Sequence, residues 1–136
     1  MTDTTTAVLA AADALVAAFG RHDTSAYFDA FSPAATFIFH NLDRTLENRT
    51  EYEAEWALWE NRDGFQVRGC RSTNRKVQLF GDLAVFTHAV ETDLTVGGEA
   101  LTSNERETIV FARQPDGRWL AVHEHLSATT ALEHVH

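Results

Sequence analysis

The spacing of hydrophobic residues divides the chain into a mainly helical first half and a stranded second half. Val8, Leu15 and Phe19 recur at near-helical spacing in an alanine-rich stretch, and Gly20 follows as a stop signal. The pattern Thr50-Glu-Tyr-Glu53 is a capping box that opens another helix. Three helices are therefore predicted, over residues 7–19, from Thr24 or Ser25 through Phe31, and from Thr50 to about Trp59.

The remaining hydrophobic segments are rich in aromatic and β-branched residues, which favour strands. Strands are predicted over residues 35–40, 65–80, 83–94, 101–113 and 119–126. Turns at Gly81-Asp82, Gly97-Gly98 and Pro115-Asp-Gly117 join the last four strands into an antiparallel meander. Helices and strands alternate too little for a parallel doubly wound sheet. The predicted fold class is α+β, with a strongly curved antiparallel sheet and three helices on its concave side.

Composition narrows the function classes. The 136 residues fit one domain, with a core over about residues 7–127 and a short C-terminal tail. The formal net charge of −9 argues against nucleic acid as a partner, because phosphate binding needs a basic patch. No apolar run approaches the roughly 20 residues that span a bilayer, and residues 1–6 do not form a signal peptide, so we expect no membrane partner and a cytoplasmic location. Cys70 is the only cysteine, which excludes an intrachain disulfide and a cysteine-based zinc site.

Three segments resemble a known superfamily, namely Gly81-Asp-Leu-Ala84, Thr102-Ser-Asn-Glu-Arg-Glu-Thr108 and Asp116-Gly-Arg-Trp-Leu-Ala-Val-His-Glu-His-Leu-Ser127. They are similar to the SnoaL-like proteins, which include polyketide cyclases, and to the association (hub) domain of calcium/calmodulin-dependent protein kinase II. Both groups belong to the nuclear transport factor 2-like superfamily. The resemblance implies the cone-shaped sheet of this cystatin-like fold, with helices around an apolar ligand-binding pocket. It does not identify a reaction, because this fold carries many functions.

Alternation along the strands predicts which side chains face the pocket. The pocket face is assigned Val85, Thr87, Ala89, Glu91, Glu105, Glu107, Ile109, Phe111, Leu120, Val122, Glu124 and Leu126. The outer face is assigned Phe86, His88, Val90, Arg106, Thr108, Val110, Trp119, Ala121, His123 and His125. The turn lengths suggest a register with Val122 opposite Phe111, with Ile109 between Glu124 and Thr87 in one row, and with Leu126, Glu107 and Ala89 in the next. The outer face would then expose a large apolar patch, which predicts a homodimer packed sheet to sheet. The patch comprises Phe86, Val90, Val110 and Trp119.

Glu124 is the first candidate for a catalytic residue. Its predicted row places a carboxyl group among aliphatic neighbours, and burial there raises its pKa toward neutrality, which suits a general acid or base. The resemblance implies the same role, because SnoaL-like cyclases carry a catalytic aspartate at this position of the last strand. A purely structural carboxylate is the alternative. His40 ends the first strand near the pocket mouth and is the second candidate, either as a proton shuttle or as a loop cap.

A further set of residues is predicted to bind the ligand, namely Glu91, Glu107, Ile109, Phe39, Trp56 and Trp59. Ion pairing of the two glutamates and core packing of the two tryptophans are the competing interpretations. The resemblance also implies that functional residues of two related groups are missing from this chain. The tyrosine and two acids of ketosteroid isomerases correspond to Leu15, Phe39 and Ile109, so steroid isomerisation by that mechanism is not expected. The pocket arginines of the kinase hub correspond to Glu91, Ile109 and Leu126, so binding of small carboxylates is not expected either.

His123 and His125 lie two residues apart on one strand, with His88 on a neighbouring strand, a spacing compatible with a metal. A subunit contact is the favoured interpretation, and no metal is predicted. The sequence thus predicts a small-molecule-binding domain that moves protons on an apolar, ring-containing substrate without a cofactor, with Glu124 as base and His40 assisting. The alternative is a non-catalytic ligand-binding or oligomerisation module.

Overall fold

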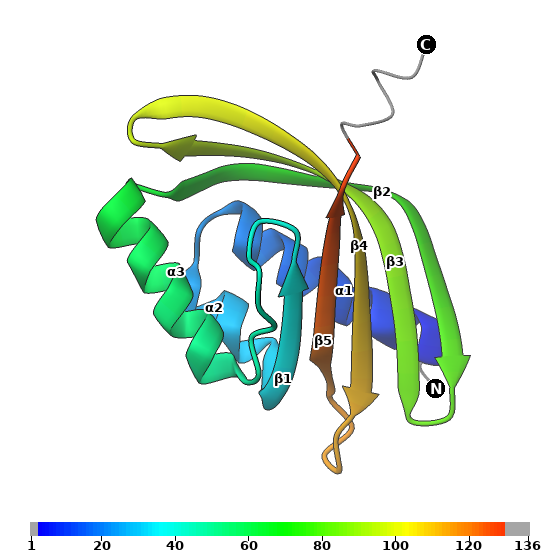
Figure 1. The fold of residues 1–136 in the computed structure, drawn as a ribbon. Coiled ribbons are helices and arrows are strands. Elements are labelled where there is room, and N and C mark those ends of the chain that lie inside the picture. Colours follow the sequence, from blue (N-terminus) through cyan, green and yellow to red (C-terminus); the bar gives the residue numbers. More distant parts are fainter. Residues whose placement is uncertain (1–2, 130–136) are drawn as a thin grey trace.

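A computed structural model describes residues 3–129, so the C-terminal tail from residue 130 lies outside the described residues. Three helices and five strands follow one another along this part of the chain (Figure 1). Their order and bounds are α1 (Thr4–Gly20), α2 (Thr24–Asp29), β1 (Phe31–Phe39), α3 (Arg49–Asp63), β2 (Gln66–Phe80), β3 (Leu83–Val96), β4 (Glu99–Arg113) and β5 (Trp119–Ala128). The predicted α+β class and its element order are confirmed, with element bounds that differ by a few residues.

The strands form one sheet in the order β1-β5-β4-β3-β2. The meander from β2 to β5 is antiparallel, as predicted. β1 pairs with β5 in parallel, so the sheet is not antiparallel throughout. A parallel neighbour requires a long crossover connection, and here α3 together with β2, β3 and β4 lies between the two strands in the chain.

The helices begin up to three residues before the predicted starts, because an Asp or Asn side chain provides each N-cap. Asp3 accepts a hydrogen bond from the backbone N–H of Thr6, and Asp23 accepts one from that of Ala26. Asn48 caps α3 by accepting from the N–H of Glu51 at 2.9 Å. These side chains satisfy backbone donors that the first helical turn leaves free.

The sheet curves so strongly that the β3–β4 hairpin bends over the end of α3 (Figure 1). The backbone N–H of Gly97, in the hairpin turn, donates to the carbonyl of Asp63 at 2.7 Å. Gly64 ends α3 with a φ of 64°, a left-handed conformation that glycine adopts without strain. Bulges in β2, between Val67 and Gly69 and between Thr73 and Lys76, add to the bending. One side of the sheet therefore becomes a deep concave surface, which the helices cover.

The predicted pocket face is correct on β4 and wrong on β3. Ile109 pairs with Glu124 as predicted, but its other neighbour is Phe86 and not Thr87. The hairpin turn has two residues, so Val96 pairs with Glu99, whereas the predicted register required one residue more. A slip of one residue moves every side chain of a strand to the other face. The interior of β3 is therefore built from Ala84, Phe86, His88, Val90 and Thr92.

A bulge also divides β5. Val110 pairs with His123 but Phe111 pairs with Ala121, so Val122 is an extra residue and does not face Phe111 as predicted. Trp119 and Ala121 consequently turn inward and are buried. Because Trp119, Phe86 and Val90 all lie inside the molecule, the apolar patch predicted for the outer face does not exist with that composition.

Candidate active site

A cavity of about 240 Å³ lies between the helices and the concave side of the sheet. All three helices and all five strands contribute to its wall. Seven aromatic side chains line it, namely Phe19, Tyr27, Phe39, Tyr52, Trp56, Trp59 and Phe65. Such a concave, mainly apolar space with a few polar groups is typical of a small-molecule site.

Two glutamates lie together on the sheet side of the cavity, and we call Glu107 and Glu124 the carboxylate pair. Glu107 is 7% exposed and Glu124 is 2% exposed. Burial raises the pKa of Glu107 to about 7. Burial, followed by the charge of Glu107, raises the pKa of Glu124 well above its usual range. Because two adjacent buried carboxyl groups do not both ionise near neutral pH, the pair shares a proton.

The hydrogen bonds around the carboxylate pair indicate where this proton resides. His88 Nε2 lies 2.6 Å from Glu107 Oε1, and His88 Nδ1 lies 2.6 Å from the hydroxyl of Ser72. Burial and the nearby Arg75 lower the pKa of His88 to about 4, so its ring is neutral. The tautomer with a proton on Nε2 donates to Glu107 and accepts from Ser72. This short bond favours the charged form of Glu107, so Glu124 retains the proton.

The helices supply a second pair of polar side chains next to the carboxylate pair. The hydroxyls of Tyr27 on α2 and Tyr52 on α3 lie 2.9 Å apart. The Tyr27 hydroxyl donates to Glu124 Oε1 at 3.4 Å. Burial, followed by the charge of Glu124, raises the pKa of both tyrosines well above the usual value. Both phenols therefore stay neutral, with the Tyr27 proton directed to Glu124 and the Tyr52 proton directed to the Tyr27 oxygen.

A hydrogen-bonded pair of side chains lies at the mouth of the cavity. His40 follows β1, and its Nε2 lies 2.5 Å from Glu105 Oε2 on β4. The His40 side chain is 40% exposed and that of Glu105 is 16% exposed. Both residues line the cavity, so His40 lies at the entrance as predicted, at a distance from the buried floor.

The structure places the predicted ligand-binding residues in two groups. Phe39, Trp56, Trp59 and Glu107 line the cavity together with Glu124. Ile109 and Glu91 do not belong to the lining. Ile109 is fully buried between Phe86 and Glu124 in the sheet. Glu91 lies on the outer side because of the register slip of β3, and its carboxylate pairs with Arg71 at 2.6 Å.

Three polar residues of the site were not predicted, namely Tyr27, Tyr52 and His88. Tyr52 lies four residues before Trp56, a spacing that places both on one face of α3, so helical periodicity contained this signal. Tyr27 lies on a six-residue helix, too short for a periodic pattern. His88 was assigned to the outer face with His123 and His125, but it faces the interior, and His123 instead bonds Thr36 Oγ1 at 2.8 Å. The three histidines therefore do not converge.

No cluster of three or more His, Cys, Asp or Glu side chains among residues 3–129 is arranged to hold a metal ion. Among the same residues, no helix combines the length and the apolar character needed to cross a membrane.

Comparison with known proteins agrees with this architecture. An NTF2-like protein from Cytophaga hutchinsonii has a TM-score of 0.79 at 15% identity, over 94% of this chain and 100% of that one. A ketosteroid isomerase-like protein from Erwinia carotovora atroseptica gives 0.80 at 18% identity, over 96% and 99%. The association domain of C. elegans CaMKII gives 0.68 at 22% identity, over 89% and 92%. At these identities the similarity establishes the fold alone.

A search among curated proteins found no match. The SnoaL-like domain family, in contrast, matches residues 8–131, which include every helix and strand of the sheet apart from the first turn of α1. The chain therefore belongs to the SnoaL-like domain family.

Proposed function

We propose that this protein binds a small, ring-containing molecule and transfers protons on it without a cofactor. The observation that carries the proposal is the carboxylate pair, which sits nearly buried at the aromatic cavity and holds one proton between two carboxyl groups. A general acid or base works best when its pKa lies near the working pH, and Glu107 meets that condition.

The geometry supports a division of roles within the pair. Glu124 carries the proton and acts as the acid, while Glu107, whose pKa is about 7 and whose anion accepts a hydrogen bond from His88, acts as the base. This reverses the role that the sequence suggested for Glu124. The Tyr27 hydroxyl lies beside Glu124, with that of Tyr52 behind it, and rotation of either O–H toward the substrate would let it donate to a developing oxyanion. His40 and Glu105 keep an assisting role at the mouth, where they exchange protons with solvent.

A second candidate function is a non-catalytic module for ligand binding or oligomerisation. Two observations favour it. The cavity is lined mostly by apolar side chains, and one structural relative is an association domain. In this reading the carboxylate pair only positions a ligand, and the outer face of the sheet contacts a second copy of the chain.

Exchange of carbon-bound hydrogen tests the catalytic proposal without knowledge of the natural substrate. Cyclic ketones, for example 2-tetralone and N-methyl-4-piperidone, are incubated with the protein in D₂O, and deuterium incorporation beside the carbonyl is followed by NMR. We expect wild type to accelerate exchange for a ketone that binds. Glu124→Gln should lose about 10²–10⁴ of that acceleration, because it removes the proton and preserves the shape.

Glu99→Gln is the matched control, because Glu99 is exposed on β4 away from the cavity. It removes one carboxylate elsewhere and should exchange at the wild-type rate. A ketone that binds in the cavity but exchanges no faster than in buffer would contradict proton transfer and favour the binding module.

A further inference from the structure

The ionisable side chains that line the cavity are mainly acidic. Glu105, Glu107 and Glu124 all contribute to the wall, and no lysine or arginine among residues 3–129 does. Within the same part of the chain, His40 is the one basic residue of the wall, and it is hydrogen-bonded to Glu105. Arg75, whose charge lowers the pKa of His88, is paired with Asp13 of α1 at 2.6 Å and does not belong to the lining. Nothing in the wall therefore compensates the charge of the carboxylate pair.

The seven aromatic rings that line the same cavity favour the same kind of ligand. Aromatic faces carry negative electrostatic potential and attract ammonium groups, most strongly where water is excluded. Tyr52 and Trp56 are almost completely buried, so this part of the wall is dry. A ligand carboxylate or phosphate would meet the opposite situation, with like charge on the sheet side and no cation to receive it.

We infer that the natural ligand is an organic cation, an apolar ring that bears a protonated or quaternary amine. This inference rests on the proposed binding function of the cavity and specifies its substrate class. The ring packs among the aromatic side chains of α3 and β1, and the ammonium group lies between Glu107 and the rings. The ammonium group is then attracted both by the carboxylate of Glu107 and by the faces of the aromatic rings. A neutral or anionic ligand gains neither attraction.

Three probes of similar size test the inference in wild-type protein. They are benzyltrimethylammonium, its neutral carbon isostere neopentylbenzene, and phenylacetate. Binding is measured by quenching of the fluorescence of Trp56 and Trp59, both of which line the cavity. We expect the cation to bind at least tenfold more tightly than the neutral isostere, and phenylacetate to bind more weakly than either.

Glu→Gln substitutions identify which side chains cause the preference for the cation over its neutral isostere. Glu107→Gln should reduce the advantage of the cation over the neutral isostere to less than about threefold while the isostere binds as before. Glu105→Gln at the mouth should reduce it less, and it provides a second measurement if the first variant folds poorly. Glu99→Gln, which removes the same charge outside the cavity, should keep the full preference.

The outcomes separate this inference from the proposed function. Equal or tighter binding of neopentylbenzene by wild type would overturn the organic-cation inference and leave proton transfer on a neutral ring intact. Preference for phenylacetate would overturn it as well. Failure of all three probes to bind would contradict both the inference and ring binding in the cavity.

Discussion

Burial in the sheet favours the neutral forms of three side chains, namely His88, Glu107 and Glu124. It lowers the pKa of His88 to about 4 and raises that of Glu107 to about 7. In the unfolded chain their values are near 6.5 and 4.3. Between about pH 4.3 and 6.5, folding therefore moves one proton from His88 to Glu107 without changing the number of bound protons. Together, His88 and Glu107 therefore contribute almost no pH dependence to the free energy of unfolding in that range.

Glu124 has no such compensation. Its pKa is raised by folding, so its contribution to stability is complete below the unfolded value of about 4.3 and is lost as pH rises toward the folded value. Above the unfolded value, and until the folded value is reached, the native state binds more protons at this site than the unfolded state. The contribution of Glu124 to stability then falls with increasing pH, with a slope of up to about 1.4 kcal/mol per pH unit for one proton.

The pH dependence contributed by Glu124 can be tested with a variant that does not titrate at this position. Urea unfolding of Glu124→Gln should show a smaller loss of stability between pH 5 and 8 than wild type, because glutamine does not titrate. Comparing the two proteins cancels the contribution of His123, whose lowered pKa acts in the opposite direction. Glu99→Gln should follow wild type. Parallel slopes for wild type and Glu124→Gln would mean that Glu124 is ionised in the folded protein.

The same residues show how far sequence reasoning reaches. Glu124 was predicted to be buried and to have a raised pKa, from strand alternation and the likeness to SnoaL-like cyclases, and both features are present. The partnership of Glu107 with His88 was not predicted, because it joins β4 to β3 and depends on the register between them. The predicted register was wrong by one residue and placed His88 on the outer face, so its effect on the charge of Glu107 could not be predicted.

At the scale of elements, the two errors of face assignment have one physical origin. Element type and order follow from periodicity and turn residues, which act over a few positions of the sequence. Register depends on features that periodicity does not carry, namely the two-residue turn at Gly97-Gly98 and the bulge at Val122. The parallel pairing of β1 with β5 is likewise decided by tertiary packing between segments about 90 residues apart.

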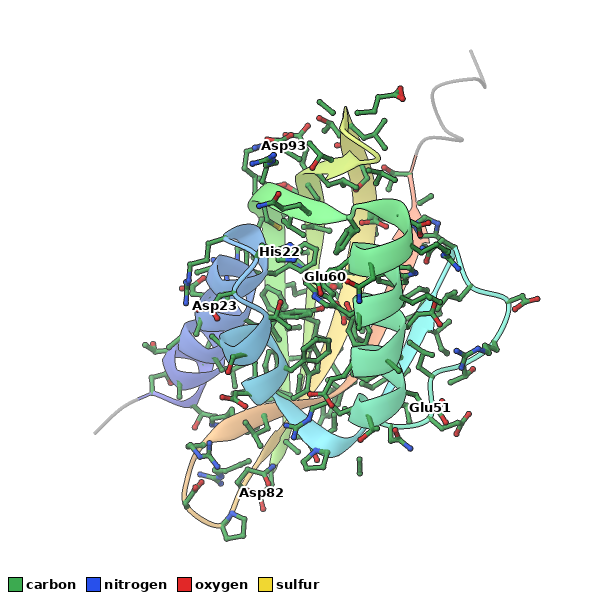
Figure 2. The ribbon with its side chains drawn as sticks, turned by 90° about the vertical axis from the view of Figure 1, so that its left-hand side faces the viewer. His22, Asp23, Glu51, Glu60, Asp82 and Asp93 are labelled. Atoms are coloured by element: carbon green, nitrogen blue, oxygen red, sulfur yellow. The ribbon has the colours of Figure 1, made fainter. Side chains whose placement is uncertain are left out.

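One histidine connects three elements beside the cavity. His22 follows α1 with a φ of 55°, and its Nδ1 accepts a hydrogen bond from the N–H of Val67 on β2 at 2.9 Å. Its Nε2 must then carry the proton, and it donates to Glu60 of α3 at 2.6 Å. Figure 2 shows His22 and Glu60 pointing toward one another between these elements. The ring also packs on Trp56, at 5.0 Å between ring centroids.

The second prediction concerns this connection. His22→Ala should destabilise the fold by about 2–3 kcal/mol, because it leaves the partly buried Val67 N–H without an acceptor and removes a ring packed on Trp56. Chemical denaturation measures the difference. Arg21→Ala is the control, since Arg21 is exposed and makes a surface ion pair with Asp23, so its change should stay within about 0.5 kcal/mol. Equal effects of the two substitutions would contradict the role assigned to His22.

At the scale of the whole molecule, the helices cover the concave side of the sheet and leave the outer face open (Figure 1). Phe86, Val90 and Trp119 no longer account for an apolar patch there, since they lie inside. Other apolar side chains on the outer face stay partly exposed, namely Ile38, Val85, Val110 and Leu120. Val85 and Val110 are directly paired at the centre of the sheet. The homodimer therefore remains our proposal, with a different set of contact residues.

The third prediction tests that assembly. Wild type should sediment as a dimer at micromolar concentration, because a partly apolar sheet face of this kind is normally covered in solution. Val110→Lys should shift the protein toward monomer, since it places a charge at the centre of the proposed contact, and circular dichroism should show that the sheet is retained. Thr50→Lys adds the same charge on the exposed side of α3 and should leave the dimer unchanged. A wild-type monomer, or a dimer that Val110→Lys does not weaken, would remove the outer face as the interface and leave the cavity as the functional surface for which the structure provides evidence.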